Sequence, residues 1–463
     1  MLCQKGERMT NTFYEVPCIR PLITGDDAVR NTAPSAQIPM EDTIAAPPVI
    51  VSVPGSKSIT NRALLLATLA DGVSTLHGVL FSDDSRHFLK CIQSLGFETS
   101  VDEDNRTVCV TGLGGRVPLP EASLYVGSAG TAARFLSAYL GISKGVYHMD
   151  ASQQMRRRPM APLLTCLEGL GCEITFEDRD GFFPFTLKGN GFSQNEITVD
   201  IGSSSQFLSA LLISACMAEH DMTIRIKGTH GMSYIKMTEI MMEQFGVTVL
   251  HPSKNCFVIS KGQKYTARTY EIEPDVSAAC YFYAMAPLLD VPVLVRGVHL
   301  SSMQGDLTFL RILEKMGCTL KEQPDGILLL PPKDHLIHGI DVDMSACSDQ
   351  AITLAAVAVF ADTPTTIRNI SHIRLQESNR MAAIVNELEK MGIRCVETQN
   401  DLTIFPGTPS ACTVETYEDH RMAMGFSLIG LRISGIRIKD PMCCRKTFEN
   451  YFEVLEEVAA QLS

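Results

Sequence analysis

The sequence predicts an α+β fold built from six repeats of one unit, and three observations lead to this prediction. Five amphipathic segments end in glycine at intervals of 75, 75, 71 and 75 residues. Six other segments, which are more apolar, alternate with them. Short β-branched runs, such as 223–226, 293–295 and 365–367, lie between the helices. Because these features recur together, we expect each unit to hold strands, one exposed helix and one buried helix.

The glycine-terminated segments are the expected exposed helices. Their apolar residues fall at helical spacing, as at Phe309, Ile312, Leu313 and Met316. A glycine after the last turn readily adopts the left-handed conformation that ends a helix. The five glycines are Gly96, Gly171, Gly246, Gly317 and Gly392. Residues 451–463 fit a sixth, truncated copy.

The more apolar segments are the expected buried helices, and each begins with small or polar residues. They start near residues 56, 128, 203, 274, 348 and 418. Helix N-termini carry unpaired N–H groups and partial positive charge, which favour anions. If three units pack into each of two domains, the six N-termini can face one cleft between the domains. Ordinary capping by Ser and Asp is the alternative interpretation.

Composition narrows the class of protein. With 40 Lys and Arg against 52 Asp and Glu, the net charge of −12 argues against broad binding to nucleic acid or anionic membranes. No apolar stretch reaches the roughly 18 residues of a membrane span. Fifteen cysteines without a CxxC pair are expected to be reduced, and the acidic first 45 residues lack a signal-peptide core. We therefore expect a cytoplasmic protein, with a loop insert at 31–48.

The first buried helix carries groups suited to phosphate. Gly55 is followed by Ser56, Lys57 and Ser58, and Arg62 comes about one turn later. The pattern is not a P-loop, because that motif needs adjacent Gly-Lys and an earlier glycine. A cation and hydroxyl groups at a helix start nevertheless predict an anion site.

The N-termini of the later buried helices and three basic segments add candidate site residues. They are Ser128, Gly130, Thr131 and Arg134 at the second start, Ser204, Ser205 and Gln206 at the third, Asp349 at the fifth, and Asp419, His420 and Arg421 at the sixth. Asp349 precedes a very apolar run and fits a helix cap as well as a general base. Arg158, Arg380 and Lys446 lie outside these starts, where a solvated surface charge is the ordinary interpretation.

Taken in order, the motifs resemble those of the shikimate-pathway enolpyruvyl transferases, the 5-enolpyruvylshikimate-3-phosphate synthase family. They are PGSKS from Pro54, GSAGTAxR from Gly127, MxxRP from Met155, SSQF from Ser204, the segment 370–380, DHRMAM from Asp419 and KTFxxYF from Lys446. The resemblance covers roughly 49–452. It implies two domains of three βαβαββ-type repeats each, an inside-out α/β barrel, with residues 55–272 as one domain and 1–54 plus 273–463 as the other.

The resemblance also implies two substrates and their ligands. Shikimate 3-phosphate would be bound by Lys57, Ser58, Arg62, Ser204, Ser205, Gln206, Tyr234, Asp349 and Gln376. Phosphoenolpyruvate would be bound by Lys57, Gly130, Arg158, Gln206, Arg380, Arg421 and Lys446. Supporting roles would fall to Ser128, Thr131, Arg134 and His420. Seven cations among these residues face two phosphates and two carboxylates, which together carry roughly −5 to −6.

The implied reaction is an addition–elimination in aromatic amino acid biosynthesis, with no metal, no cofactor and no covalent enzyme intermediate. Asp349 would accept the proton of the shikimate 5-hydroxyl as its oxygen attacks C2 of phosphoenolpyruvate. Glu377 or Lys57 would protonate the methylene carbon. The expected partners are the two substrates alone, with no nucleic acid and no membrane, and we expect a monomer.

Three positions depart from the family pattern. Gln376 stands where members usually carry a Lys that contacts the shikimate phosphate, and Asn379 replaces a common Asp. The stretch before Tyr234 is one residue shorter, which leaves open whether Ser233 is a ligand. We expect altered affinity with activity retained, because Glu377 and Arg380 are present.

Two other functions are compatible with parts of the sequence. The UDP-N-acetylglucosamine enolpyruvyl transferases share the fold, but they carry Lys-Asn where this chain has Lys57-Ser58 and they lack the SSQF match. A catalytically silent, anion-binding paralogue would be supported only by Gln376 and Asn379.

Overall fold

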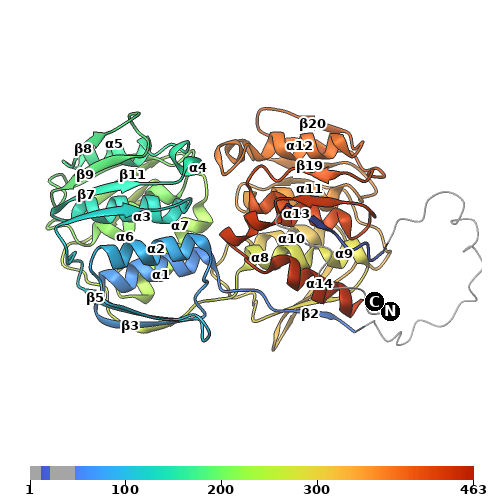
Figure 1. Cartoon of the computed structure of the whole chain (residues 1–463), viewed down its shortest axis with the longest axis horizontal. Helices are drawn as coiled ribbons and strands as arrows, with labels where there is room; N and C mark the ends of the chain where they lie inside the picture. Colours follow the sequence, from blue (N-terminus) through green and yellow to red (C-terminus); the bar gives the residue numbers. More distant parts are fainter. Residues whose placement is uncertain (1–11, 21–46, 463) are drawn as a thin grey trace, which may run out of the picture.

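The structure is a computed structural model that describes residues 12–20 and 47–462. Residues 31–46 of the expected loop insert lie outside this range. Two lobes stand side by side, one coloured blue to yellow-green and the other yellow to red with two blue strands (Figure 1). Each lobe has its own apolar core, one drawn from residues between 59 and 272 and the other from residues 14–16, 49–53 and 276–458.

The chain passes between the lobes at two adjacent places. Gly55 and Pro274 form an antiparallel bridge there, and the Ser56 N–H donates to the Glu273 carbonyl. The N-terminal strands belong with the later part of the chain, because Phe13–Glu15 (β1) pairs with Arg437–Lys439 (β23) and Val49–Val51 (β2) pairs with Val293–Arg296 (β15). The crossing therefore brings the start of the first buried helix to the junction of the lobes.

The first lobe contains three four-stranded sheets. Their strands are Thr269–Glu271 (β14), Asp71–His77 (β3), Thr107–Leu113 (β5) and Thr99–Asp102 (β4) in one; Glu121–Tyr125 (β6), Gly145–Asp150 (β7), Phe185–Gly189 (β9) and Glu173–Phe176 (β8) in the next; and Glu196–Asp200 (β10), Met222–Lys227 (β11), Cys256–Ile259 (β13) and Leu250–Ser253 (β12) in the third.

The second lobe contains two four-stranded sheets and one three-stranded sheet. Their strands are Thr319–Gln323 (β16), Gly326–Leu330 (β17), β15 and β2; Asp341–Asp343 (β18), Thr365–Arg368 (β19), Leu402–Ile404 (β21) and Cys395–Glu397 (β20); and β1, β23 and Thr413–Val414 (β22). In each four-stranded sheet one parallel pair is followed by two antiparallel pairs, as in β6–β7–β9–β8. The strands expected at 223–226, 293–295 and 365–367 are confirmed within β11, β15 and β19.

The helices separate into two kinds, as predicted. The buried ones are Lys57–Leu69 (α1), Gly130–Ile142 (α3), Gln206–Ala215 (α6), Val276–Tyr283 (α8), Ala351–Ala358 (α11) and His420–Gly430 (α13). The amphipathic ones are Asp83–Ser94 (α2), Ala161–Gly169 (α5), Met232–Gln244 (α7), Leu307–Lys315 (α10), Arg380–Lys390 (α12) and Tyr451–Gln461 (α14). Shorter helices are Gln153–Arg156 (α4), Met285–Leu289 (α9) and the 3₁₀ turns Ser348–Gln350 (η1), Ser371–Leu375 (η2) and Pro441–Lys446 (η3).

The glycine stops are confirmed. All five glycines that follow the amphipathic helices have positive φ, from 79° at Gly392 to 110° at Gly317. One expected helix is broken in two, because α8 ends at Tyr283 and α9 begins at Met285. Pro287 explains the break, since its ring clashes with the carbonyl four residues earlier and it has no N–H to donate.

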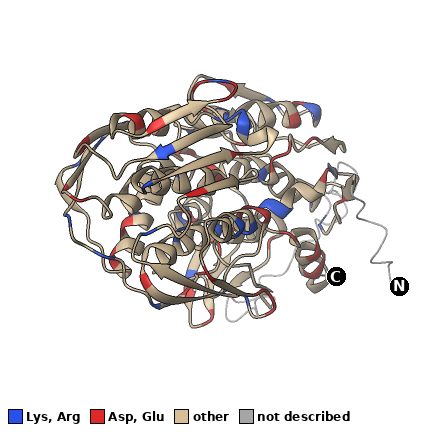
Figure 2. Ribbon diagram, turned by 60° about the vertical axis from the view of Figure 1, so that its left-hand side comes forward, with Lys and Arg blue, Asp and Glu red and all other residues tan. Residues whose placement is uncertain are grey.

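Two composition-based expectations can be compared with the structure. Within residues 12–20 and 47–462, no helix has both the length and the apolar character needed to span a bilayer. The cysteines of these residues are all free, and most are buried. Acidic and basic residues are interspersed along the ribbon (Figure 2).

Candidate active site

The predicted ligands gather around one cavity where the lobes meet. Those that line it are Lys57, Ser58, Arg62, Gly130, Thr131, Arg158, Ser204, Ser205, Gln206, Tyr234, Asp349, Gln376, Glu377, Arg380, His420 and Arg421. The other three predicted residues, Ser128, Arg134 and Lys446, lie directly behind the lining. Arg134 donates to the Gly130 carbonyl at 3.2 Å, and Lys446 Nζ lies 3.3 Å from the Ser128 carbonyl oxygen.

Five of the six buried helices begin at this cavity. Lys57, Gly130 and Gln206 are the first residues of α1, α3 and α6, His420 is the first residue of α13, and η1 leads Asp349 into α11. The sixth, α8, begins at a smaller neighbouring pocket that shares Lys57 and His420 with the cavity. The expectation that the N-termini converge is therefore met by five of the six helices at the main cavity.

Capping accounts for only some of these starts. Ser56 and Asp419 accept from N–H groups in the first turns of α1 and α13. The first turns of α3 and α11 receive no bond from the side chain at the cap position. Because uncapped N–H groups retain their capacity to bind an anion, ordinary capping does not explain the position of α3, whereas the first N–H of α11 already donates to the Ser348 carbonyl of η1.

Arg380 is the centre of an ion-pair cluster. It is 2% exposed, and its guanidinium donates to Asp419 at 2.8 Å, to Glu377 at 2.6 Å and to Asp349 at 2.9 Å. Burial would lower its pKa, but the three carboxylates together raise it. Arg380 therefore stays charged and fixes three carboxylates that come from different segments.

Asp349 is held by groups from both lobes. Its two oxygens accept from Arg380 and from Arg421, each at 2.9 Å, and the Tyr234 hydroxyl donates to it at 3.2 Å. Burial would raise the pKa of this carboxyl, yet Arg421 and Arg380 lower it well below the ordinary value. The cap position of α11 is occupied by Gln350, whereas the Asp349 carboxylate accepts from Arg380, Arg421 and Tyr234. The geometry thus favours an ionised carboxylate at the cavity over a structural helix cap.

Glu377 is similarly surrounded by cations. Beside Arg380, its carboxylate lies 3.2 Å from Lys446 Nζ and 4.0 Å from Arg158 Nη1. Burial alone would raise its pKa, but the neighbouring cations Lys446, Arg380 and Arg158 hold it well below the usual value. Glu377 is therefore a carboxylate in this arrangement, and it can donate a proton only after it has received one.

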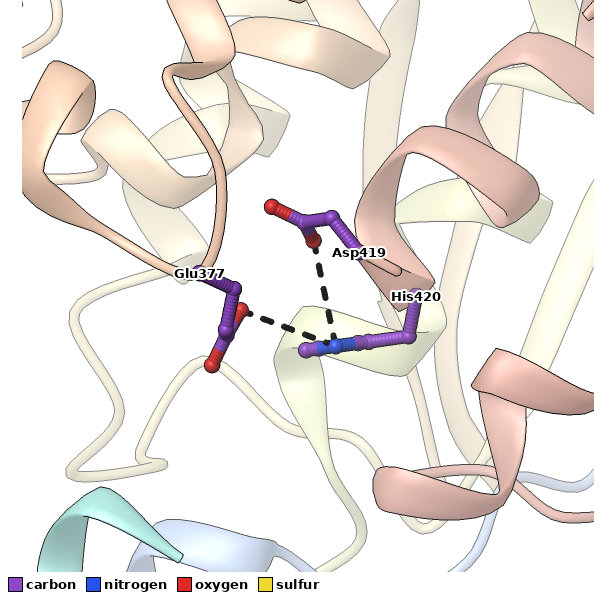
Figure 3. Close-up of side chains that lie close together, drawn as sticks. All are labelled: Glu377, Asp419 and His420. Atoms are coloured by element: carbon purple, nitrogen blue, oxygen red, sulfur yellow. Dashed lines mark ion pairs between the residues drawn. The ribbon is translucent and has the colours of Figure 1, made fainter. Parts of the chain in front are cut away.

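Glu377, Asp419 and His420 lie close enough together to suggest a metal site (Figure 3). His420 Nδ1 is 3.7 Å from Glu377 and 3.9 Å from Asp419. Burial lowers the pKa of His420 well below its ordinary value, so the ring is neutral. However, both carboxylates are already paired with Arg380, and Lys446 adjoins Glu377. A divalent cation here would be repelled by charges that the protein itself supplies.

Lys57 and Arg62 differ in their partners. Lys57 Nζ lies 3.6 Å from Asp84, whereas Arg62 donates to Thr238 at 2.8 Å and to the Ser58 carbonyl at 3.0 Å. Within the described residues no carboxylate pairs with Arg62, and burial lowers its pKa to about 10. Arg62 is therefore a buried cation with charge available for an incoming anion.

The three departures from the family pattern have different surroundings. Gln376 lines the cavity, so a ligand bound there would meet a neutral amide at this position. Asn379 caps α12 by accepting from the Ala382 N–H, a task that Asn and Asp perform equally well. Ser233 donates to the Ala346 carbonyl across the lobes at 3.0 Å and does not line the cavity.

Several residues at the site were not predicted from the sequence. Asp84 lies in the first turn of α2, where an acidic residue is an ordinary helix feature. Asp306 is buried and accepts from Ser277 at 2.8 Å, and burial raises its pKa. His230 lines the cavity, and His372 packs against it. Asp84, Asp306 and His230 stand outside the motifs, and His372 falls within the segment 370–380 but was given no role there.

Comparisons with known proteins identify the family of this chain. Residues 47–455 match the family described as EPSP synthase (3-phosphoshikimate 1-carboxyvinyltransferase). The 3-phosphoshikimate 1-carboxyvinyltransferase of Nostoc punctiforme is 44% identical over 403 residues, which cover 87% of this chain and 94% of the relative. A protein of Halalkalibacterium halodurans named 3-phosphoshikimate 1-carboxyvinyltransferase 2 is 39% identical over 416 residues, 89% of this chain and 92% of the relative.

A solved structure supports the fold. EPSP synthase from Acinetobacter baumannii superposes with a TM-score of 0.74 at 24% identity, covering 88% of this chain and 95% of that structure. At this identity the likeness concerns the mixed α/β architecture alone. The family match and the curated relatives carry the assignment: the chain belongs to the EPSP synthase family.

Proposed function

We propose, from its membership of the EPSP synthase family, that this chain transfers the enolpyruvyl group of phosphoenolpyruvate to the 5-hydroxyl of shikimate 3-phosphate. The products are 5-enolpyruvylshikimate 3-phosphate and phosphate, on the route to chorismate and the aromatic amino acids. One observation carries the proposal beyond the family match. Asp349 lies in the cavity between Arg380 and Arg421 of its own lobe and Tyr234 of the other, where a base and anion-binding groups meet.

The two substrates are assigned to two overlapping sets of residues at the cavity, which share Lys57 and Gln206. Shikimate 3-phosphate is assigned to the side formed by Lys57, Ser58, Arg62, Ser204, Ser205, Gln206, Tyr234, Asp349 and Gln376. Phosphoenolpyruvate is assigned to Lys57, Gly130, Arg158, Gln206, Arg380, Arg421 and Lys446. The second set supplies five cations for one phosphate and one carboxylate, and bidentate arginine pairing suits both groups. The uncapped start of α3 adds backbone N–H donors on the same side.

Catalysis requires two proton transfers. Asp349 takes the proton of the 5-hydroxyl while its oxygen bonds to C2 of phosphoenolpyruvate, and the methylene carbon receives a proton from Glu377 or Lys57. The resulting tetrahedral intermediate loses phosphate and returns one proton from its methyl group. A substrate carboxylate that takes over Arg380 and Arg421 frees Asp349 from its two strongest partners, and the pKa of this carboxyl then rises toward a useful value.

For the architecture, we propose that the six sheets are copies of one βαβαββ unit in an inside-out barrel. The parallel and antiparallel order common to the four-stranded sheets supports that interpretation. The separate cores support a division into 55–272 and 1–54 plus 273–463. We further assign a monomer, because ligands from the two lobes of one chain complete the cavity, and a cytoplasmic location, because the cysteines of the described residues are free.

Phosphate release tests the function directly. The protein is mixed with phosphoenolpyruvate and shikimate 3-phosphate, and UDP-N-acetylglucosamine serves as the control acceptor. Release with shikimate 3-phosphate alone is expected. Release only with the sugar nucleotide would overturn the assignment, and release with neither acceptor would favour a silent, anion-binding role.

A further inference from the structure

Two histidines from different lobes stack beside the cavity. His230 precedes α7 in the first lobe and His372 lies in η2 of the second, and their ring centroids are 3.8 Å apart at an interplanar angle of 44°. His372 Nε2 lies 2.7 Å from Ser348 Oγ. His230 lines the cavity, and its Nδ1 is buried with no hydrogen-bond partner among the described residues. The proposed reaction gives neither ring a role.

The pair adjoins two helix N-termini. Gly231, with φ of 64°, is the cap residue of α7, and a Cβ at this position would lie 2.5 Å from Ser205 Oγ. The loop that carries His230 therefore abuts Ser205, which precedes the first residue of α6. Two helix starts and a hydroxyl favour an anion at this end of the cavity.

Permanent positive charge is scarce at this end. Arg380 and Arg421 are engaged by carboxylates, Lys57 Nζ lies 3.6 Å from the Asp84 carboxylate, and the amide of Gln376 is neutral. Arg62 is the nearby cation without a carboxylate partner among the described residues, and it lies beneath Ser58 and Tyr234, to whose carbonyls it donates. A phosphate monoester carries about −1.5 to −2 at neutral pH. One fixed cation leaves part of that charge uncompensated.

Both rings are neutral in this arrangement. Burial lowers the pKa of His230, and burial and the neighbouring His230 lower that of His372 to about 4. Of the charged groups facing the pair, Asp349 favours protonation of both rings and Arg380 disfavours it for His372. Two neutral rings can stack without repulsion. A dianion at Ser205 would shift this balance toward one imidazolium.

We infer that His230 and His372 form a proton-accepting pair that binds the phosphate monoester of the acceptor, with one imidazole nitrogen taking one proton from solvent as the ligand enters. This assignment rests on the proposed function, because shikimate 3-phosphate is the monoester concerned. It makes acceptor binding pH-dependent and supplies charge that Gln376 does not.

Calorimetry detects the proton directly. Shikimate 3-phosphate is titrated at about pH 7.5 in buffers of different ionisation enthalpy, where an unperturbed histidine is largely neutral. Wild type is compared with His230→Asn and His372→Asn. His148→Asn is the matched control, since this exposed histidine pairs with Glu177 away from the cavity. Release of protons by the ligand itself is common to all four proteins. Differences in proton uptake between the proteins therefore report the contribution of His230 and His372.

Wild type and His148→Asn are expected to take up more protons than either pair variant, by up to about one per site. Their affinity should strengthen toward lower pH by as much as about tenfold per pH unit for a full proton. If a variant fails to fold, ¹⁵N-histidine NMR of wild type serves, because a new imidazolium signal should appear on addition of ligand.

Equal proton uptake in wild type and both pair variants, or no imidazolium signal, would overturn the inference. Phosphate release with unchanged proton uptake would leave the proposed function standing without the pair. Binding with proton uptake but without phosphate release would support the pair and contradict the transferase assignment. A failure of shikimate 3-phosphate to bind would overturn both.

Discussion

Replacing Asp349 with Asn removes a charge and preserves the size of the side chain. If Asp349 is the general base, turnover should fall by about 10²- to 10⁴-fold, because an amide cannot accept the 5-hydroxyl proton. Loss of a helix cap is not expected to contribute, since Gln350 rather than Asp349 occupies the cap position of α11. The effect should therefore appear in the chemical step, measured by single-turnover phosphate release.

The same substitution should leave phosphoenolpyruvate binding intact or tighten it. The Asp349 carboxylate occupies Arg380 and Arg421 through two 2.9 Å bonds that a substrate carboxylate must displace. A charge-assisted hydrogen bond contributes about 1.5–3 kcal/mol and a neutral one about 1 kcal/mol. Asn should thus hold Arg380 and Arg421 about 1 kcal/mol less strongly than the Asp349 carboxylate does. This difference would lower the dissociation constant of phosphoenolpyruvate by roughly fivefold.

The two readouts together distinguish a base from a structural carboxylate. Asp178→Asn is the matched control, because Asp178 is exposed and lies 3.8 Å from Arg156 outside the cavity. Lower turnover with equal or tighter phosphoenolpyruvate binding is expected for Asp349→Asn alone. Near-normal turnover would refute the catalytic role. Weaker binding would refute the idea that the carboxylate competes with substrate.

Three further changes test other parts of the site. Gly130→Ala would place a Cβ 2.7 and 3.1 Å from the nitrogens of two arginines, so KM for phosphoenolpyruvate should rise by about tenfold or more; an unchanged KM in steady-state assays would contradict this placement. Gln376→Lys should tighten shikimate 3-phosphate by roughly 1 kcal/mol and reduce the proton uptake on binding, both measured by calorimetry; weaker binding would show a pocket adapted to Gln. The Asp362 side chain raises the pKa of His338. The resulting stabilisation is present below the ordinary histidine pKa and is lost as pH rises through the raised value, so His338→Asn should lower Tm near pH 6 and much less near pH 9. Equal losses of Tm at both pH values would exclude this linkage.

The sequence predicted the features that are local and repeated. Helical spacing of apolar residues and a terminal glycine depend on a few consecutive residues, and both kinds of helix are found where they were expected. Ligand candidates at helix starts were also predictable, since a cation after Gly55 or a glycine at Gly130 has a direct physical use there. Pro287 explains the one helix that the structure divides.

Contacts between distant segments could not be predicted in the same way. Asp84 gives the sequence signal of an ordinary acidic first turn, and only the fold brings it to Lys57. His230 and His372 are separated by 142 positions and meet because two lobes adjoin. The pairing of Arg380 with three carboxylates likewise depends on tertiary structure.

The ion-pair cluster bears on how one cavity can be stable and reactive. Seven cations held near one another would repel, and Asp349, Glu377 and Asp419 act as internal counter-ions that offset this cost. A substrate carboxylate or phosphate must replace those counter-ions, so its affinity is the difference between two strong interactions. The displaced carboxylates then lose the charges that lower their pKa, and they become bases only when substrate is present. Binding and activation of the base are, on this argument, the same exchange of partners, so a substitution that stops the substrate from displacing the carboxylates should also prevent activation of the base.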